Sequence, residues 1–563
     1  MSRVLVIGLD GATFDLIDPW IKEGKLPVLG QCLREGTRST LRSTPLSNSA
    51  QAWSSFITGK NPGKHGIYDF FERVPDGYGV RFLNASFRKG KSLWRLASDA
   101  GRRVGVMNVP ITYPAEPVNG FLIPGLDAPG MDNRFAYPRG LMDEIDEEVG
   151  RYILEAGIWG YIRRGKPEAA LEKLLEMARV RTATASYLLK TKKWDLFVVV
   201  YTATDKAQHH FWKYIDPSRP EFLSTQPHGS AILQVYQQID QGIARLIQAA
   251  GDATVIVMSD HGAGPSSRRT MYINRWLQHE GFLRSVDGRR VSGGIGRLKY
   301  RLLEGADNQI RKMLPRRVKE RMVRLLPRLR DRVDSVLLLA GIDWSQTLAY
   351  SRENHPAIFI NLAGREPGGI VEGGDHYQIV RDRVIQKLRG LRCPETGLPI
   401  VGEIFRREDV FHGSETLRGP DIIFRWNQSL YVHRPSGPGS AGPFLEALED
   451  RAILASENTR RPSGIHRDEG IFIGRGRVMR RGKSMAGATI YDIAPTVLYL
   501  LGLPVPDDMD GSVLREAIDE GYLSQNPVRT VTPSDGETTA AEEFGPRETE
   551  VIESKLRGLG YID

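Results

Sequence analysis

Short apolar runs without polar alternation recur along the chain, and longer stretches with helical periodicity separate them. The clearest runs are Val4–Leu9, Arg103–Met107, Leu196–Tyr201 and Thr254–Met258, and the clearest helical stretches are Pro167–Thr191 and Ala231–Ala250. Strands that are apolar on both faces and alternate with helices are typical of parallel sheets. The pattern predicts an α/β fold with a mostly parallel sheet sandwiched by helices.

The rest of the pattern predicts one large domain with inserted cap segments and a separate C-terminal end. We expect the main domain over residues 1–523, with a basic helical insertion at about 270–345 and a mixed cap at about 350–455. Residues 524–545 are rich in Ser, Thr, Pro, Gly and Glu, which predicts a disordered linker. We expect residues 546–563 to form a segment that docks back on the main domain.

One part of the first insertion is unusually basic. Residues 297–332 contain thirteen Lys or Arg against four Asp or Glu, with Leu, Met and Val interleaved. This pattern predicts a pair of basic amphipathic helices. A solvated helical cap is one interpretation, and a surface for an anionic membrane or another partner is the alternative.

The overall charge favours anionic partners. The chain of 563 residues has 77 Lys and Arg against 68 Asp and Glu, a formal net charge of +9. Such a balance suits phosphates, polyanions or an anionic membrane surface, and it carries no information on the fold. We expect no sequence-specific binding of nucleic acid, and the sequence leaves the oligomeric state open.

The two cysteines and the N-terminal residues bear on location. Cys32 and Cys393 form no CxxC pair, which excludes a zinc ribbon and a disulfide framework and favours a reducing compartment. The chain starts directly with a strand pattern, and no stretch approaches the length of about 18 apolar residues that a membrane span needs. We therefore expect a cytoplasmic protein.

Acidic and imidazole side chains follow several of the predicted strands. In sheets of this kind, sites form beyond the carboxyl ends of the strands. A lone Asp there is commonly a helix cap and a lone His is commonly structural, but three strand ends contribute such residues here. Asp and neutral His suit Zn²⁺ or Mn²⁺. Asp10 follows the first run, Asp205 and His209 follow the run Leu196–Tyr201, and Asp260 and His261 follow the run Thr254–Met258. Asp205 and His209 are four positions apart, which places them on one face of a helix. His466 precedes a further apolar run, Gly470–Gly474.

The order of the motifs around these residues resembles the alkaline phosphatase superfamily. The nearest branch is the type I phosphodiesterase/nucleotide pyrophosphatase group with its bacterial phosphohydrolase and phosphomutase relatives, and the similarity covers roughly residues 4–515. The motifs are GLDG (8–11), SNSAQAW (47–53), TGKNPGKHG (58–66), DKAQHH (205–210), SDHG (259–262) and GIHRDEG (464–470).

The resemblance implies a site with two divalent metal ions, Zn²⁺ in the first place and Mn²⁺ in the second. Ser49 stands at the position of the family's nucleophile. The implied ligands are Asp10, Ser49, Asp260 and His261 for one ion, and Asp205, His209 and His466 for the other. Further candidates for substrate binding are Asn48, Asn108 and Lys206, whereas His65 and His210 are expected to be structural.

The implied activity is hydrolysis of phosphate esters, such as phosphodiesters or nucleotides, through a phosphoserine at Ser49. Coordination to a dication lowers the pKa of a serine hydroxyl, and a second dication can bind the leaving oxygen. A phosphomutase or phosphotransferase on the same scaffold is the alternative, and a non-catalytic protein that binds polyanions or membranes through residues 297–332 is another. An arylsulfatase is disfavoured, because Ser49 lacks the sequence context that formylglycine formation requires.

Overall fold

A computed structural model describes most of the chain. The described residues are 3–75, 77–217, 228–286, 339, 341–352, 355–427, 431–434, 442–447, 462–533 and 541–559. The basic segment 297–332 lies outside the described residues, so its expected helices and its expected membrane contact stay predictions. No helix among the described residues is long and apolar enough to span a lipid bilayer.

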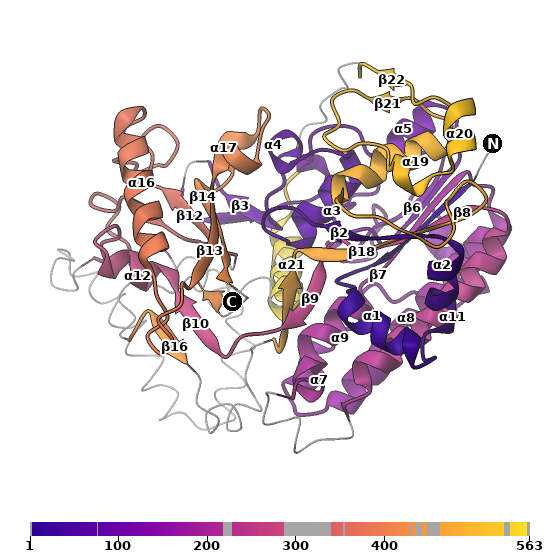
Figure 1. The fold of residues 1–563 in the computed structure, drawn as a ribbon, viewed down its shortest axis with the longest axis horizontal. Helices are drawn as coiled ribbons and strands as arrows, with labels where there is room; N and C mark the ends of the chain where they lie inside the picture. The colour runs from indigo at the N-terminus through magenta and orange to yellow at the C-terminus, as the bar shows by residue number, and fades with distance from the viewer. Residues whose placement is uncertain are drawn as a thin grey trace.

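A large sheet forms the centre of the molecule (Figure 1). Its strand order within the described residues is β19-β2-β18-β8-β1-β7-β5-β6, with β20 paired to β2. Neighbours from β8 to β6 are parallel, whereas β18 is antiparallel to β8 and to β2. This confirms the predicted mostly parallel sheet. The strands are β1 (Val4–Leu9), β2 (Thr37–Arg42), β5 (Val104–Met107), β6 (Gly120–Ile123), β7 (Leu196–Tyr201), β8 (Thr254–Met258), β18 (Glu469–Arg475), β19 (Lys483–Ser484) and β20 (Ala488–Thr489).

Helices cover both faces of this sheet, and the central strand β1 shows how. Leu5 and Ile7 point into the core on one face, and Val4 and Val6 point into the core on the other. Because successive side chains of a strand alternate between faces, a strand in this position is apolar throughout. The first face carries α1 (Phe14–Lys22), α2 (Pro27–Glu35), α8 (Pro167–Thr191), α9 (Ala203–Phe211) and α11 (Ala231–Ala250), and the second carries α3 (Ser49–Thr58), α5 (Leu93–Asp99) and α19 (Ile493–Leu500).

A second lobe with its own hydrophobic core lies beside the sheet (Figure 1, orange and magenta). It contains a four-stranded sheet of order β11-β12-β14-β13 and a three-stranded sheet of order β15-β10-β16. Its elements come from both expected insertions. They are β10 (Arg269–Tyr272), α12 (Ile273–His279), β11 (Ala349–Tyr350), β12 (Ala357–Ile360), α16 (Asp375–Gly390), β13 (Val401–Arg406), α17 (Arg407–Val410), β14 (Ile422–Trp426), β15 (Val432–Arg434) and β16 (Leu445–Ala447).

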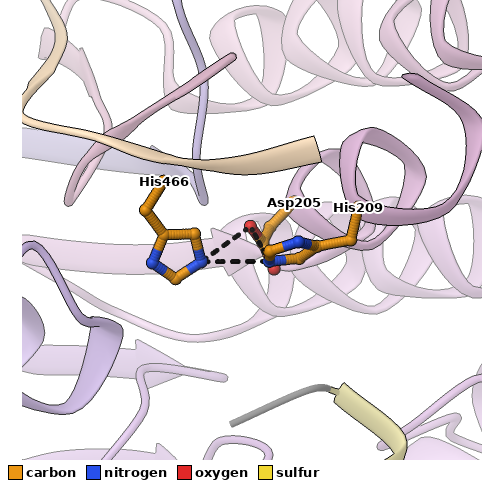
Figure 2. Close-up of side chains that lie close together, drawn as sticks. All are labelled: Asp205, His209 and His466. Atoms are coloured by element: carbon orange, nitrogen blue, oxygen red, sulfur yellow. Dashed lines mark hydrogen bonds and ion pairs between the residues drawn. The ribbon is translucent and has the colours of Figure 1, made fainter. Parts of the chain in front are cut away.

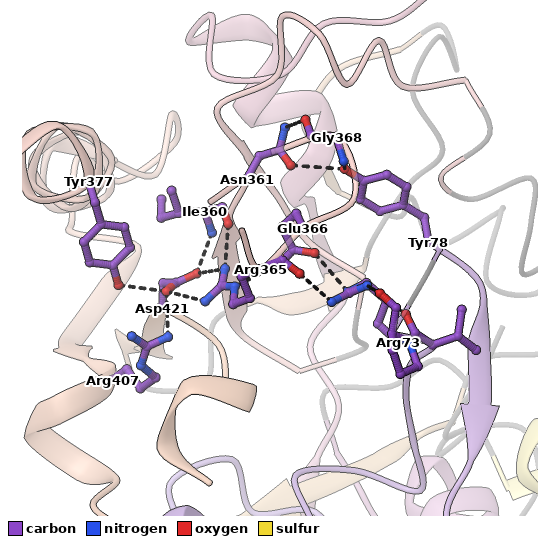
Figure 3. Close-up of polar contacts among 12 residues, drawn as sticks. Arg73, Tyr78, Ile360, Asn361, Arg365, Glu366, Gly368, Tyr377, Arg407 and Asp421 are labelled. Atoms are coloured by element: carbon purple, nitrogen blue, oxygen red, sulfur yellow. Dashed lines mark hydrogen bonds and ion pairs between the residues drawn. The ribbon is translucent and has the colours of Figure 1, made fainter. Parts of the chain in front are cut away.

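A hairpin from the N-terminal third of the chain reaches the second lobe. It consists of β3 (Phe71–Arg73) and β4 (Val80–Phe82). In the turn between them, the Tyr78 ring stacks on the Trp344 ring with centroids 3.5 Å apart. Arg73 forms an ion pair with Glu366 at 2.9 Å, as Figure 3 shows. The hairpin therefore ties the second lobe to the main sheet.

The C-terminal part of the chain returns to the main domain. In the expected linker 524–545, residues 524–533 and 541–545 are described, and β22 (Thr530–Val531) pairs with β21 (Val505–Pro506). Beyond it, α21 (Pro546–Leu559) buries Ile552 and Leu556 in a cluster that also contains Ala50. The expected boundaries of linker and docking segment stay predictions.

Candidate functional site

Three adjacent parallel strands bring their carboxyl ends to one place. Asp10 follows β1, Asp260 and His261 follow β8, and Asp205 and His209 lie on α9 directly after β7. Since β8, β1 and β7 are neighbours in the sheet, these side chains meet at one edge. The four-residue spacing places Asp205 and His209 on the same face of α9.

His466 reaches the same edge by a different route. It lies on β17 (Gly464–Arg467), which pairs antiparallel with β9 (Gly262–Pro265) and sets His466 opposite Ala263. Glu469, two residues beyond β17, approaches Gly262 so closely that only glycine fits there. A Cβ on Gly262 would lie 2.0 Å from the Glu469 carbonyl oxygen, which is far inside van der Waals contact.

The first group of potential metal ligands contains Asp205, His209 and His466 (Figure 2). Asp205 Oδ1 lies 3.2 Å from His209 Nε2 and 3.5 Å from His466 Nε2, and the two Nε2 atoms are 3.0 Å apart. Ligand atoms at about 2.0–2.1 Å from a tetrahedral Zn²⁺ stand about 3.3 Å from one another. The separations in this group therefore fit a single divalent ion.

The second group contains Asp10, Asp260 and His261, all of them buried. His261 Nε2 lies 3.7 Å from Asp10 Oδ1 and 3.3 Å from Asp260 Oδ2. Neither of these two oxygens accepts a hydrogen bond from a described residue. Buried carboxylate oxygens without a partner are costly, so their presence fits a cation that they would coordinate.

Backbone carbonyls fix the tautomer of all three histidines. Nδ1 of His209 lies 2.7 Å from Gly464 O, Nδ1 of His261 lies 2.9 Å from Gly262 O, and Nδ1 of His466 lies 2.8 Å from Ser47 O. A carbonyl oxygen only accepts, so each Nδ1 carries a proton, and each ring in its neutral form offers its Nε2 lone pair. This arrangement is typical of metal-binding imidazoles.

The two groups lie next to each other. The rings of His261 and His466 stack with centroids 3.7 Å apart. Burial and then the charges of Asp260 and Asp205 raise the pKa of Asp10 well above its usual range. Burial also disfavours the charged form of Asp205, but His209 and His466 outweigh it and hold the pKa of Asp205 well below its usual range. The concentration of negative charge fits divalent cations.

Ser49 lies at the start of α3, beside the second group. Its side chain is fully buried, and Ser49 Oγ is 3.1 Å from His261 Nε2. Because His261 Nδ1 holds the ring proton, the serine hydroxyl is the donor to Nε2. The structure thus brings Ser49 together with all six Asp and His residues that the sequence singled out.

Two of the three candidates for substrate binding, Asn48 and Lys206, are engaged with the protein. Asn48 donates to Tyr68 O at 2.8 Å and accepts from Gln51 N, so its amide caps α3 and fixes the loop before Ser49. Lys206 forms an ion pair with Glu155 and is almost fully buried.

Asn108 differs from these two, because part of its amide is available. The residue has a left-handed backbone (φ 64°), and its Nδ2 donates to Val200 O at 3.0 Å. Its Oδ1 is buried and accepts no hydrogen bond within the described residues. Asn108 therefore offers an acceptor, which suits a hydroxyl group better than a phosphoryl oxygen.

The two remaining histidines of the motifs have structural contacts. His65 accepts from Ile67 N at 3.1 Å and lies 3.0 Å from Ser55 Oγ, which holds the loop after α3. The ring of His210 packs on Trp159 with centroids 5.6 Å apart. A residue that the sequence did not reveal is His355, whose Nε2 lies 3.7 Å from Asp69 Oδ2 near the same site. No local motif marks this pair, because its members lie far apart in the sequence.

Solved structures share the fold of this chain. A phosphonoacetate hydrolase from Sinorhizobium meliloti 1021, in complex with phosphonoacetate, has a TM-score of 0.52 and 15% identity, and the match covers 89% of this chain and 95% of that one. The complex of the same enzyme with phosphonoformate has a TM-score of 0.52 and 16% identity, and the match covers 89% of this chain and 95% of that one. The human ectonucleotide pyrophosphatase/phosphodiesterase 5 has a TM-score of 0.48 and 13% identity, and the match covers 92% of this chain and 100% of that one. At 15% and 16% identity, the likeness to the phosphonoacetate hydrolase concerns the fold alone.

The sequence assigns the chain more narrowly. The family model of type I phosphodiesterase/nucleotide pyrophosphatase matches residues 4–385, which is more than half of the chain. The chain therefore belongs to the type I phosphodiesterase/nucleotide pyrophosphatase family. His466 lies beyond the matched range and joins the site through β17. No curated protein sequence matches the chain significantly.

Proposed function

We propose that this protein is a metal-dependent phosphohydrolase that cleaves phosphate esters, with phosphodiesters or nucleotides as substrates and Ser49 as the nucleophile. The observation that carries the proposal is the position of Ser49 Oγ, 3.1 Å from His261 Nε2 and beside two groups of potential metal ligands. Membership of the phosphodiesterase family supports it.

Each ligand group would hold one ion. Asp10, Ser49, Asp260 and His261 would hold one, and Asp205, His209 and His466 would hold the other. Zn²⁺ suits these ligands best, and Mn²⁺ suits them as well. When bound, such ions lower the pKa of the serine hydroxyl and neutralise charge on the phosphoryl oxygens.

The residues of the chain provide the remaining chemistry. Ser49 Oγ loses its proton and forms the bond to phosphorus while the bond from phosphorus to the leaving oxygen breaks. The leaving oxygen takes up a proton and departs as an alcohol, and Ser49 keeps the phosphoryl group, with its second ester group if the substrate is a diester. Water then cleaves the phosphoserine, releases the phosphate product and restores the hydroxyl. Ser49 is the first residue of a ten-residue helix, whose N-terminus favours the anionic phosphoryl group.

The test compares hydrolysis of bis(p-nitrophenyl) phosphate and p-nitrophenyl phosphate after chelation and reloading with Zn²⁺ or Mn²⁺. Ser49→Ala is expected to lower kcat by roughly three orders of magnitude or more, as is typical of a lost nucleophile. Ser54→Ala is the matched control. Its hydroxyl lies on the same helix, is buried and makes no hydrogen bond within the described residues. Full activity of Ser49→Ala would refute the proposed nucleophile.

The products separate the proposed activity from its alternatives. Acid quench during turnover, followed by mass spectrometry, is expected to show phosphate from the monoester, or p-nitrophenyl phosphate from the diester, on the peptide that contains Ser49. Transfer of that phosphate to water identifies a hydrolase, whereas transfer to a hydroxyl of the substrate identifies a mutase. A preference for the monoester would replace the diester assignment by a phosphatase.

A further inference from the structure

A histidine of the second lobe stands beside the site but belongs to neither ligand group. His355 lies just before β12, and the Pro356 carbonyl accepts from Phe424 N at 3.0 Å, which anchors this stretch to β14. The next residue, Ala357, packs in one cluster with Leu46 and Tyr68 of the main domain. The stretch that contains His355 therefore rests on the segments that flank Ser49.

The partner of His355 belongs to the loop that positions Ser49. Asp69 follows Tyr68, whose carbonyl accepts from Asn48 Nδ2 at 2.8 Å, and Asn48 is the residue before Ser49. Asp69 Oδ1 accepts from Phe70 N at 2.7 Å, and only 1% of the side chain is exposed. Asp69 Oδ2 lies 3.7 Å from His355 Nε2.

The surroundings of His355 point to a ligand. Burial is the main cause that lowers its pKa to about 3, and the charges of His466, His433 and His261 add to it. The ring therefore lies near a histidine of each ligand group, His466 of the first and His261 of the second. His355 Nε2 makes no hydrogen bond within the described residues, while 15% of the side chain is exposed. A buried imidazole nitrogen without a hydrogen bond reduces stability, so packing alone does not explain this residue.

We propose that His355 donates a hydrogen bond from Nε2 to a non-bridging oxygen of the phosphate ester that is bound at Ser49, while Asp69 holds the ring proton on that nitrogen. This inference rests on the proposed function. A neutral imidazole carries one proton, and a carboxylate 3.7 Å from Nε2 favours that nitrogen over Nδ1 as the place of the proton. Nε2 makes no other hydrogen bond within the described residues, so its N–H can donate to a substrate oxygen. The second lobe would thereby contribute directly to recognition of an anionic phosphoryl group, and a loop of the main domain would set the direction of its donor.

The test uses the full chain, reloaded with metal, and the variants His355→Ala, His355→Gln and Asp69→Asn. His279→Gln is the control, because His279 lies on α12 of the same lobe with 63% of its side chain exposed. For each protein we would measure kcat/KM on bis(p-nitrophenyl) phosphate, the inhibition constant of inorganic phosphate, the metal content and the melting temperature.

The expected result follows from the loss of one hydrogen bond to a charged group. His355→Ala should lower kcat/KM and raise the inhibition constant of phosphate by roughly 10- to 100-fold each, with unchanged metal content. His355→Gln should recover part of this loss, since its amide still donates. Asp69→Asn keeps the shape of the side chain and should give a smaller change in the same direction. The control should stay within about twofold of wild type.

Other outcomes overturn the inference. If His355→Ala lowers the melting temperature but leaves kcat/KM and phosphate inhibition unchanged, the residue is structural. If it loses metal, the residue supports a ligand and not the substrate. Should His355→Ala fail to fold, unchanged phosphate inhibition in Asp69→Asn would refute the pair. Full activity of Ser49→Ala would instead refute the proposed function, so the two failures are distinguishable.

Discussion

At the scale of single residues, the site depends on three imidazoles, each of which has its Nδ1 proton held by a backbone carbonyl. His209, His261 and His466 each donate from Nδ1 to a backbone carbonyl, so Nε2 faces the other ligand atoms. The sequence could indicate the residue types, because Asp and His follow buried strands. It could not show the carbonyl partners, since Ser47 and Gly464 reach the rings only through the tertiary fold.

The two ligand groups predict separable effects on metal content. His466→Ala or Asp205→Asn should reduce the metal content from two ions per chain to one, because each removes a ligand of the same group. Elemental analysis after dialysis measures the ratio. His210→Phe is the matched control, since His210 neighbours His209 but packs on Trp159. Retention of two ions in both ligand variants would contradict the assignment of this group.

At the scale of elements, local pattern sufficed for the central sheet. The apolar runs Val4–Leu9, Leu196–Tyr201 and Thr254–Met258 are strands with these bounds, and Arg103–Met107 differs by one residue. They are buried on both faces, so their composition alone is distinctive. The strands of the second lobe are short and pair across long separations, as β10 does with β15 and β16. Their pairing depends on tertiary contacts that no local pattern contains.

The second lobe is organised around one buried carboxylate (Figure 3). Asp421 is fully buried and binds Arg365 at 2.6 and 2.8 Å and Arg407 at 2.9 Å. It also accepts from Tyr377 Oη at 2.8 Å and from Ile360 N at 2.6 Å. Burial opposes ionisation of Asp421. The charges of Arg365 and Arg407 and the hydrogen bond from Ile360 N–H outweigh burial, so the pKa of Asp421 lies below its usual value.

This shift predicts how the stability of the lobe changes with pH. A carboxyl group whose pKa is lower in the folded state stabilises the fold above its unfolded pKa of about 3.9 and loses that contribution as the pH falls through the folded pKa. Asp421→Asn removes the buried charge that Arg365 and Arg407 share, so that, among the described residues, only Glu366 and Glu408 remain as their charge partners. The loss should cost roughly 3–5 kcal/mol at pH 7. Urea unfolding of both proteins between pH 7 and pH 3 measures the difference. It should stay constant down to about pH 4 and shrink below that value, and a difference independent of pH throughout would contradict the assigned ionisation.

At the scale of the whole molecule, the candidate site lies where the two lobes meet. The ligand groups and Ser49 belong to the main domain, whereas His355 belongs to the second lobe. Their relative position depends on the β3–β4 hairpin, in which Tyr78 stacks on Trp344 at an interplanar angle of 6° and accepts from Gly368 N at 3.0 Å. Asp69 lies just before this hairpin, so one segment carries both the junction and the partner of His355.

Loosening this junction should therefore reduce activity without removing metal. Trp344→Ala deletes the stacked ring and should lower kcat/KM by roughly tenfold, because small displacements of a positioning group are costly. If the effect acts through His355, the double variant Trp344→Ala/His355→Ala should be no worse than His355→Ala alone, and a double-mutant cycle measures this. Metal content by elemental analysis should stay at the wild-type value in all three proteins. Fully additive losses would mean that the junction acts on the site independently of His355. Unchanged kcat/KM in Trp344→Ala would mean that the stacked ring is not needed to position the second lobe relative to Ser49.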